Sequence, residues 1–427
     1  MADKKLEFVN LKYRPKGKDL ICLFRISPNN MSMEKAANTV ALESSVGTWT
    51  RVAGQEYVEK LRAKVFSIKG NYIKIAYPDA LFEKDNVPNI LSSIAGNILG
   101  MNAVKTIRLE DVSFPKSILR SFSGPKFGIE GIRKMMKVNN RPLLGTIIKP
   151  KIGLNTQHHS QSAYESWIGG CDFVKDDENL ASQKFNEFEK RISKTLEKAD
   201  RAESDTGEKK AYLVNVTAET KEMIKRAQIV ENQGGKYVMI DILTAGWAAV
   251  QTLREANFKT AIHAHRAMHA AFDRNPNHGI DMMVIADFAR LIGVDTLHIG
   301  TGIGKLEGKI KDIKELQEEI EKNNIKATKE RLEQKWWNIK PTLGVSSGGL
   351  HPGHVPFLIK NLGKNIVIQA GGGIHGHPGG TEAGAKAMRQ AVNAVMNKVS
   401  LKEYAKYHPE LRIALQKWGK RQLSTTE

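Results

Sequence analysis

Short apolar runs alternate with longer amphipathic segments through most of the chain, beginning near Leu143. The short runs are rich in β-branched residues and predict buried strands, whereas the longer segments repeat apolar positions at helical spacing. Alternation of this kind is typical of βα units that build a parallel sheet. The predicted strands cover residues 143–151, 172–178, 211–217, 237–244, 260–266, 296–300, 344–349 and 365–373.

Eight βα units over about 250 residues predict a TIM barrel, because that fold closes eight parallel strands inside a ring of helices. A doubly wound sheet is the alternative, and its first turn should carry a G-x-G-x-x-G motif. The turn after the first strand reads Lys149-Pro-Lys-Ile-Gly and lacks that motif. The sequence therefore favours an α/β fold of the (β/α)8 type, with helices predicted at 184–202, 221–233, 245–256 and 280–291.

The N-terminal part of the chain has a different pattern and predicts a small α+β, ferredoxin-like domain. Its strands are predicted at 21–25, 64–69 and 71–76, and its helices at 33–42, 55–61 and 89–97. Residues 116–136 should connect this domain to the barrel. We therefore predict an N-terminal domain over residues 1–125 and a catalytic barrel domain over residues 126–427. The barrel domain should end in a helical tail, whose last helix is predicted at 401–418.

The chain has 427 residues and a formal net charge of +19, a balance also found in nucleic-acid-binding proteins. Its lysines are spread along the chain and often alternate with glutamate, so attraction of an anionic substrate is the favoured explanation. No apolar run is long enough to cross a membrane, and the N-terminus lacks the apolar core of a signal peptide. Cys22 and Cys171 imply no disulfide framework, and we expect a cytoplasmic protein without nucleic-acid or membrane partners.

The second predicted strand ends in Lys175-Asp-Asp-Glu178, the most informative segment of the chain. Side chains alternate along a strand, so Lys175 and Asp177 share a face, and Glu178 follows where the strand ends. Two carboxylates suit Mg²⁺, but a lysine ammonium beside them would repel the ion. The lysine fits a magnesium site if it has reacted with CO₂ to become an anionic carbamate. The alternative is a loop of ion pairs without a metal.

The first predicted strand ends with Lys149 and Lys151 on one face, separated by Pro150. Polar strand ends matter in a TIM barrel because the active site lies at the C-terminal ends of the strands. Neighbouring cations and desolvation lower the pKa of a lysine, which can then act as a general base or acid. A solvated turn is the alternative interpretation.

The fifth predicted strand ends in a histidine-rich segment, His263-Ala-His265-Arg266-Ala-Met-His269. His265 and His269 have the i, i+4 spacing of helix-borne zinc ligands, but the glutamate of the zinc-protease motif is absent between them. Arg266 suits a phosphate group, and His298, at the end of the sixth strand, is assigned to the same anion site. We interpret His263 as a core residue.

Glycine-rich loops follow the last three predicted strands. The first, Thr301-Gly-Ile-Gly-Lys305, is a candidate lid that brings Lys305 over substrate, with a merely flexible loop as the alternative. Glycine clusters after strands seven and eight of a barrel bind phosphate through backbone N–H groups. His375 and His377 are interpreted as loop residues. Two anion sites with a Mg²⁺ site between them suit a substrate that carries a phosphate at each end.

Together these motifs resemble ribulose-1,5-bisphosphate carboxylase/oxygenase, RuBisCO. The resemblance extends from about Ile21 to Trp418, and it is greatest to archaeal-type form III or II/III-like members. No single motif is decisive, but so many in the same order are specific. They lie at 149–154, 169–179, 265–273, 300–308, 347–351 and 371–378, and in the first domain at 43–50 and 95–100.

The resemblance implies a role for each matching residue. Lys175 resembles the carbamylated lysine, with Asp177 and Glu178 as the other Mg²⁺ ligands. Lys149 resembles the lysine that manages protons at C2 of the sugar, supported by Lys151. The other matches are Lys305, which holds the incoming CO₂; His265, near the C3 hydroxyl; Arg266 and His298, at one phosphate; Ser347, near the sugar; and Gly349, Gly371 and Gly372, at the other phosphate.

In this family the N-terminal domain of a neighbouring subunit completes the active site. Glu43, Thr48, Trp49 and Asn97 resemble the residues it contributes, which implies a homodimer with shared active sites and is compatible with a higher oligomer. No small subunit is expected. Val46 stands where the family more usually has threonine.

The implied reaction is Mg²⁺-dependent carboxylation of ribulose 1,5-bisphosphate, through an enediolate, to two molecules of 3-phosphoglycerate. O₂ competes with CO₂ for the same enediolate. In archaeal-type relatives the bisphosphate comes from nucleotide (AMP) salvage, and we expect the same pathway here.

Two alternatives remain open. RuBisCO-like proteins share the fold and metal site but catalyse an enolase or isomerase reaction in sulfur salvage, and they typically lose several carboxylation residues. Those residues are all present here, namely Glu43, Asn97, Lys149, Lys151 and Lys305. A basic nucleic-acid-binding protein on a barrel scaffold would leave the motifs at the strand ends unexplained.

Overall fold

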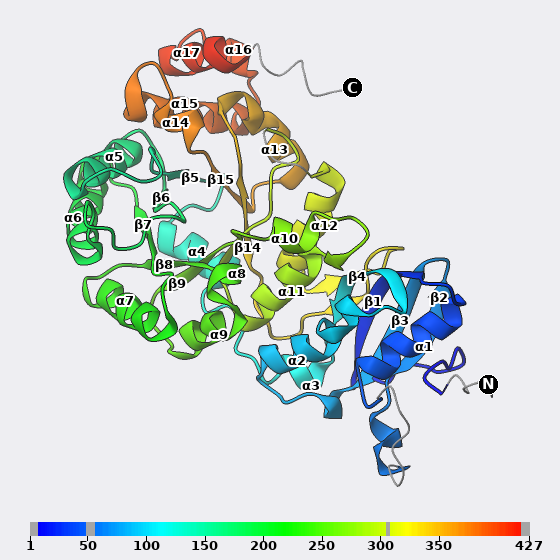
Figure 1. The fold of residues 1–427 in the computed structure, drawn as a ribbon. Coiled ribbons are helices and arrows are strands. Elements are labelled where there is room, and N and C mark those ends of the chain that lie inside the picture. Colours follow the sequence, from blue (N-terminus) through cyan, green and yellow to red (C-terminus); the bar gives the residue numbers. More distant parts are fainter. Residues whose placement is uncertain (1–6, 48–55, 305–307, 420–427) are drawn as a thin grey trace. The chain divides into compact units, whose positions relative to one another are not determined.

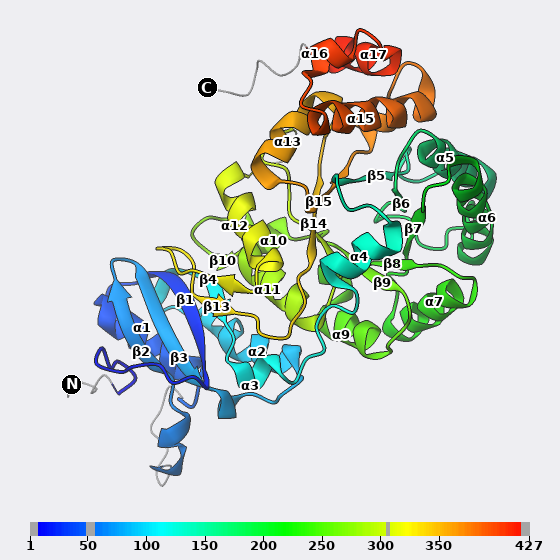
Figure 2. The ribbon, with the colours of Figure 1, turned by 180° about the vertical axis from the view of Figure 1, so that it is seen from behind.

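The computed structural model describes residues 7–47, 56–304 and 308–419 of the chain, which divides into two compact units. Unit 1 comprises residues 1–124, 268–293 and 322–340, and unit 2 comprises residues 125–267, 294–321 and 341–427. Two segments that lie between barrel strands in the sequence therefore group with the N-terminal unit. Figure 1 and Figure 2 show the elements from opposite sides.

Unit 2 contains a closed barrel with the strand order β11-β14-β15-β5-β6-β7-β8-β9, and each neighbouring pair is parallel. All eight predicted strands are present, so the TIM-barrel prediction is confirmed and the doubly wound alternative is wrong. The strands are β5 (Leu143–Ile147), β6 (Phe173–Lys175), β7 (Ala211–Asn215), β8 (Tyr237–Asp241), β9 (Ala261–His265), β11 (Thr296–His298), β14 (Leu343–Ser347) and β15 (Ile366–Gln369).

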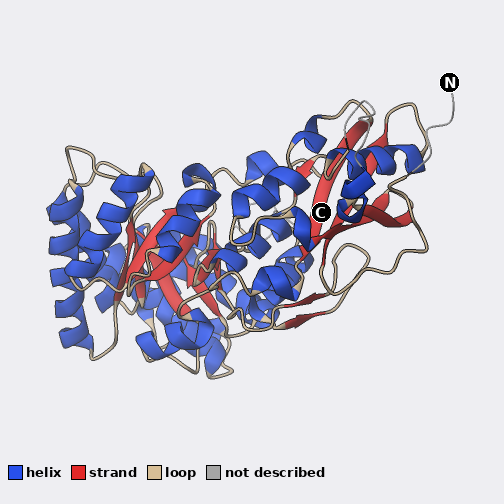
Figure 3. Ribbon diagram, turned by 90° about the horizontal axis from the view of Figure 1, so that it is seen from below, coloured by secondary structure: helices blue, strands red, loops and turns tan. Residues whose placement is uncertain are grey.

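The larger helices of unit 2 lie outside its ring of strands (Figure 1, Figure 3). They are α5 (Thr156–Ile168), α6 (Phe188–Thr206), α7 (Thr220–Asn232), α9 (Trp247–Glu255), α12 (Ile310–Glu321), α13 (Val355–Leu362) and α15 (Gly380–Met396). Unit 2 also contains α8 (Ile242–Ala245), η4 (Pro352–His354), α14 (Gly372–His375), α16 (Leu401–Tyr404) and α17 (Pro409–Trp418).

One helix closes the amino-terminal end of the barrel. Ile132 and Met136 of α4 (Gly128–Met136) are buried in one cluster with residues at the starts of the strands, including Leu143, Phe173 and Tyr237. Apolar packing therefore fills this end, and polar residues at the opposite, carboxyl ends of the strands are left to form a site.

The predicted C-terminal helix over 401–418 is wrong in one respect. The segment forms two helices, α16 and α17, because Pro409 lacks an N–H group and disfavours helical backbone at the residue before it. His408 accordingly has extended backbone angles, φ −129° and ψ 91°. Helix α5 was not predicted, since its sequence is mostly polar, although the Asn155 side chain caps it by accepting from His158 N–H at 2.9 Å.

Unit 1 contains a five-stranded sheet in the order β10-β4-β1-β3-β2, which confirms the prediction of a small α+β N-terminal part. Its strands are β1 (Asp19–Pro28), β2 (Lys64–Lys69), β3 (Tyr72–Pro78), β4 (Val104–Ser113) and β10 (Gly279–Ile280), with a separate hairpin of β12 (Asn324–Ile325) and β13 (Gln334–Lys335). Its helices are α1 (Met33–Glu43), η1 (Glu56–Leu61), η2 (Asp79–Leu81), α2 (Val87–Ile94), η3 (Asn97–Gly100), α3 (Lys116–Leu119), α10 (Ala270–Asp273) and α11 (Met282–Ile292).

Strand β4 was not predicted, because charged residues interrupt its apolar pattern. Two of those charged residues are buried and paired with each other: Arg108 donates to Glu110 at 3.2 Å, and it also donates to Asp281 at 2.6 Å. Among the described helices, none combines the length and apolar character needed to cross a lipid bilayer.

Asp295, just before β11, joins three parts of unit 2. Its carboxylate accepts backbone N–H groups of Phe127 at 2.7 Å, Gly128 at 3.0 Å and Ile262 at 3.0 Å. We expect Asp295→Ala to lower the free energy of unfolding by about 3 kcal/mol, because buried donors lose their acceptor. Urea unfolding followed by circular dichroism measures this loss. The exposed Asp312→Ala is the control, and an equal effect of both substitutions would contradict the prediction.

Asp176 attaches helices to the outside of the barrel. It is fully buried, and its carboxylate lies 3.4 Å from Arg191 Nε of α6 and 3.2 Å from His159 Nε2 of α5. It also accepts from the Tyr212 hydroxyl at 2.5 Å and from Asn215 N–H at 3.0 Å. Burial alone raises the pKa of Asp176, but Arg191, His159 and Tyr212 outweigh it and lower that pKa to about 2.

This low pKa predicts a pH-dependent contribution to stability. The unfolded value is about 4, so ionised Asp176 stabilises the fold above pH 4 and loses that effect as the pH falls towards 2. We expect Asp176→Asn to be less stable than the unchanged chain by roughly 2 kcal/mol at pH 7, and by clearly less at pH 3. Denaturant unfolding at both pH values tests this, with the exposed Asp200→Asn as control. A deficit that stays constant with pH would refute it.

Candidate active site

The carboxyl end of β6 places a buried lysine beside a carboxylate. Lys175, the last residue of the strand, is fully buried, and its Nζ donates to the Asp176 backbone oxygen at 2.7 Å. The same Nζ lies 3.7 Å from Glu178 Oε2. Asp176 points outward to the helices, whereas Lys175 and Asp177 point to the barrel mouth, in the alternation predicted for this strand.

Burial changes the ionisation of this pair. Loss of hydration lowers the pKa of Lys175, although the neighbouring carboxylates of Glu178, Asp241 and Asp177 partly offset that effect. Burial by itself raises the pKa of Glu178, but Lys175 and His265 outweigh it, and its net pKa is lowered. The site therefore favours an anionic Glu178 next to an amine that gives up its proton more easily than an exposed lysine.

Lys149 follows β5, next to β6 in the barrel, and reaches the same carboxylates. Its Nζ donates to Asp177 Oδ2 at 2.6 Å, and the Asp177 side chain is almost fully buried. A Cβ at Gly371 would lie only 3.0 Å from Lys149 Cε, so a glycine lets the loop after β15 approach this lysine. Lys151 is more exposed and donates to Asn179 Oδ1 at 3.1 Å.

His265 connects β9 to this group. Its Nε2 lies 3.7 Å from Glu178 Oε2, and its Nδ1 lies 2.6 Å from Asp241 Oδ1. Asp241 is buried at the end of β8 and was not recognised in the sequence, although a lone carboxylate closing the apolar run Tyr-Val-Met-Ile was the available signal. A carboxylate at Nδ1 fixes the ring orientation and leaves Nε2 facing the site.

Two further histidines lie beside His265 and are both buried. His263 Nε2 lies 3.0 Å from His298 Nε2, and His263 Nδ1 lies 2.8 Å from Thr296 Oγ1. Burial, followed by neighbouring positive charges, lowers the pKa of both rings well below the usual value. His263 is thus a satisfied core residue, as interpreted from the sequence. His298 is neutral and can take part in an anion site only as a hydrogen-bonding group.

The glycine loops come together at the same end of the barrel. A Cβ at Gly304 would lie 2.8 Å from the Gly348 backbone oxygen, so these two loops approach closely only with glycine at that position. A Cβ at Gly300 would lie 3.0 Å from an Arg266 side-chain nitrogen, which places Arg266 against the start of its loop. Ser347, predicted near the sugar, ends β14, and Gly349, predicted at a phosphate, lies two residues after that strand. The other two predicted phosphate-site residues, Gly371 and Gly372, precede and begin α14.

His375, interpreted as a loop residue, is instead the last residue of the short helix α14. Its Nε2 lies 3.0 Å from Thr146 Oγ1, and that hydroxyl donates to the Ala370 backbone oxygen at 2.7 Å. Because the hydroxyl proton is already used, His375 Nε2 is the donor in this pair. Burial lowers the pKa of His375 to about 4, so the ring is neutral and fastens the loop after β15 to β5.

Five other predicted site residues lie in unit 1 or outside the described residues. Glu43 ends α1 and Asn97 begins η3, and both are exposed residues of unit 1. Thr48, Trp49 and Lys305 lie outside the described residues. The residues that the barrel does bring together are those of β5, β6, β8 and β9.

The donor set can be tested against a magnesium ion. Among the described residues, no group of three or more His, Cys, Asp or Glu side chains is arranged to hold a metal. Asp177 and Glu178 offer two carboxylates, and the amine of Lys175 is 3.7 Å from the second. The set fits Mg²⁺ once Lys175 carries an acidic oxygen group, because three hard oxygen ligands then meet at one strand end.

Comparison with known proteins gives a consistent result. The family model described as ribulose bisphosphate carboxylase large chain, N-terminal domain, matches residues 7–118, and the catalytic-domain model matches residues 128–418. A ribulose bisphosphate carboxylase of Methanocaldococcus jannaschii is 51% identical over 97% of this chain and 100% of that protein. One of Methanosarcina mazei is 49% identical over 97% of this chain and 99% of that protein.

Solved structures agree with the sequence relatives. A dimeric archaeal Rubisco from Hyperthermus butylicus is similar with a TM-score of 0.92 and 47% identity, covering 97% of this chain and 99% of that one. An octameric Rubisco from Pyrococcus horikoshii, solved with sulfate, has a TM-score of 0.91 and 46% identity, covering 99% of this chain and 97% of that one. The resemblance recognised in the motifs is confirmed, and the chain belongs to the ribulose bisphosphate carboxylase large-chain family.

Proposed function

We propose that this protein carboxylates ribulose 1,5-bisphosphate to two molecules of 3-phosphoglycerate, with O₂ as a competing substrate. The observation that carries the proposal is the fully buried Lys175, 3.7 Å from Glu178 at the open end of the barrel. A lysine in that position needs a chemical role, because burying an ammonium group is costly. Family membership and relatives named as carboxylases support the same reaction.

Three residues would hold Mg²⁺, namely Asp177, Glu178 and Lys175 as its carbamate. The lowered pKa of Lys175 increases the share of neutral amine, which is the form that attacks CO₂. When bound, the ion supplies Lewis-acid polarisation of the sugar ketone and orients the substrate. Asp177 also accepts from Lys149, so the lysine that would handle the C2 proton is positioned by a metal ligand.

The remaining residues bind and orient the substrate. Arg266 and His298 would hold one phosphate, and Ser347, Gly349, Gly371 and Gly372 would hold the sugar and the other phosphate. His265, oriented by Asp241 at 2.6 Å, would face the C3 hydroxyl and transfer its proton. Lys151 would support Lys149, and Lys305 would hold the new carboxylate as CO₂ adds at C2.

We further propose a homodimer in which residues 1–125 of one subunit complete the barrel site, 126–427, of its partner. Glu43, Thr48, Trp49 and Asn97 would be the contributed residues. The relatives support this arrangement, because one is described as dimeric and another as octameric, so a higher oligomer is compatible. No small subunit is required. We propose a cytoplasmic location, which is in keeping with two free and buried cysteines. As in the archaeal-type enzymes that the chain resembles, the bisphosphate would come from nucleotide salvage.

The enolase or isomerase reaction of RuBisCO-like proteins is the competing proposal. It requires the metal site but not the full set of carboxylation residues. Lys149 is present and placed at Asp177, and Glu43, Asn97, Lys151 and Lys305 are present in the sequence. This complete set favours carboxylation.

The first test compares two buried lysines. We expect Lys175→Met to reduce fixation of radiolabelled CO₂ into 3-phosphoglycerate by more than about 1,000-fold, because the carbamate and its metal are lost together. The assay uses ribulose bisphosphate after preincubation with bicarbonate and Mg²⁺. Lys210→Met is the matched control: Lys210 is also buried, but its Nζ donates to the Cys171 backbone oxygen at 3.1 Å, before β7.

Two outcomes would overturn the carboxylase proposal. Fixation that survives in Lys175→Met would remove the carbamate from the mechanism. If the folded, metal-loaded protein without substitutions fixed no CO₂, the enolase-type reaction would become the favoured proposal.

The second test concerns the pairing of His265 with Asp241. We expect Asp241→Asn to lower kcat by roughly 100-fold with a small change in KM, because an amide cannot hold the imidazole in the proton-transferring form. The control is Asp273→Asn, since Asp273 makes a comparable contact of 2.8 Å with His269, outside the barrel site. Steady-state carboxylation measures both constants. Equal kcat values for the two variants would rule out this positioning role.

A further inference from the structure

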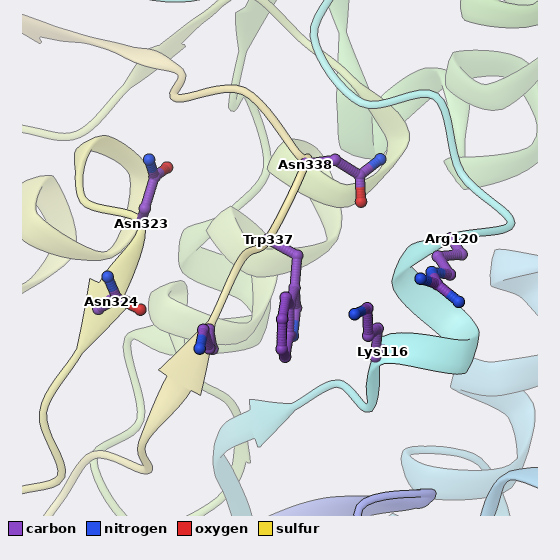
Figure 4. Close-up of a pocket in the computed structure, with 7 residues that line it drawn as sticks. Lys116, Arg120, Asn323, Asn324, Trp337 and Asn338 are labelled. Carbon is purple, nitrogen blue, oxygen red and sulfur yellow. The ribbon is translucent and has the colours of Figure 1, made fainter.

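Unit 1 contains a pocket of about 620 Å³ that the carboxylation proposal does not use. Its lining includes the cations Lys116, Arg120 and Lys335. The rest is the indole of Trp337 and amides from Asn323, Asn324 and Asn338 (Figure 4). We propose that this pocket binds a small, multiply charged oxyanion, such as pyrophosphate or a compact phosphate ester.

The positive charge of the pocket is concentrated around Trp337. Lys116 Nζ lies 3.9 Å from the centroid of the indole ring, and Lys335 Nζ lies 4.2 Å from it. Across the described residues, neither lysine nor Arg120 forms a salt bridge with a carboxylate. A π system attracts ammonium groups without neutralising them, so the pocket remains positive and its lysines are held in place.

A buried scaffold fixes the pocket walls. Trp336 is fully buried, and the Arg290 guanidinium carbon lies 4.4 Å from its ring centroid. Arg290 donates to the backbone oxygens of Lys322 at 2.7 Å and Ile339 at 3.2 Å, which joins the two chain segments on either side of the pocket. Phe114, 6.1 Å from Trp336 between ring centroids, anchors the segment that carries Lys116.

Backbone pairing reinforces the same wall. Asn324 pairs with Lys335 in the antiparallel hairpin of β12 and β13, and Trp336 N–H donates to the Asn323 backbone oxygen at 2.9 Å. These contacts preorganise the donors, which reduces the ordering cost of binding.

Trp337 itself has an unusual conformation. Its φ is 51°, a left-handed value that is uncommon for a bulky residue, and the residue is 43% exposed. Figure 4 shows the ring projecting between Asn323 and Asn324 on one side and Lys116 and Arg120 on the other. Strained backbone of this kind persists where surrounding contacts enforce it and is concentrated at binding sites.

The lining chemistry selects the ligand class. Three cations and three amides offer many hydrogen-bond donors, and the lining contains no carboxylate. A compact anion with several oxygens can reach two or more cations at once, whereas a neutral or apolar ligand gains little from them. None of these residues belongs to the barrel site, so the inference stands independently of the proposed carboxylation.

Calorimetric titration with sodium pyrophosphate in Mg²⁺-free buffer tests this inference on the full chain. The titration uses an Arg266→Ala background, which weakens anion binding at the barrel mouth. We expect Lys116→Ala/Lys335→Ala to weaken binding at least tenfold. The matched control, Lys134→Ala/Lys137→Ala, removes the same charge from a different pocket, in unit 2, that is lined by Glu130 and has no indole, and binding should be retained.

A third variant protects the test from misfolding. Trp337→Phe keeps an aromatic ring and should weaken pyrophosphate binding less than Trp337→Ala does. If the two double-lysine variants lost equal pyrophosphate affinity, the loss would reflect net charge alone, and the proposal would be overturned. Unchanged affinity in Lys116→Ala/Lys335→Ala would also overturn the proposal, and so would a background protein that binds no pyrophosphate. A third contrary outcome is that the protein binds single-stranded RNA more tightly and pyrophosphate does not displace that RNA.

Discussion

The alternation of side chains at the end of β6 is the constraint on which the rest of the structure depends. Lys175 and Asp177 face the barrel mouth, whereas Asp176, between them, faces Arg191 and His159 outside the strands. A one-residue shift in register would exchange these faces and place Asp176 at the barrel mouth, where the proposed metal ligands lie. The outer ion pair therefore stabilises the packing of two helices and also fixes which side chains point inward.

The surroundings of the Lys175 amine replace little of the hydration that an ammonium group would lose on burial. The amine has one backbone oxygen at 2.7 Å and a thioether sulfur at 3.1 Å as partners, and the nearest carboxylate is 3.7 Å away. Such partners do not replace the hydration of a full positive charge, which is why burial dominates the lowered pKa of Lys175. An anionic carbamate at this point would gain both the metal and relief from that desolvation.

The sequence predicted the parts of the fold that local pattern determines. All eight barrel strands were recognisable, because each is a buried apolar run followed by polar or glycine residues. Strand β4 and residue Asp241 were missed for a common reason: each depends on a charged side chain whose partner is distant in sequence, such as Asp281 for Arg108 and His265 for Asp241. The break between α16 and α17 was local and could have been read from Pro409.

The net charge of +19 does not by itself indicate a function, because the role of each cation depends on the group with which it pairs. At the barrel mouth, Lys149 is paired with Asp177 at 2.6 Å, so the proposed anionic substrate would meet a cation already balanced by a carboxylate. Around Trp337, by contrast, Lys116 and Lys335 lie against a π system, and no carboxylate in the described part of the chain forms a salt bridge with them. The first arrangement suits proton transfer, because the balance of charge shifts during the reaction. The second suits equilibrium binding, because its charge is fixed and directed into a preformed pocket.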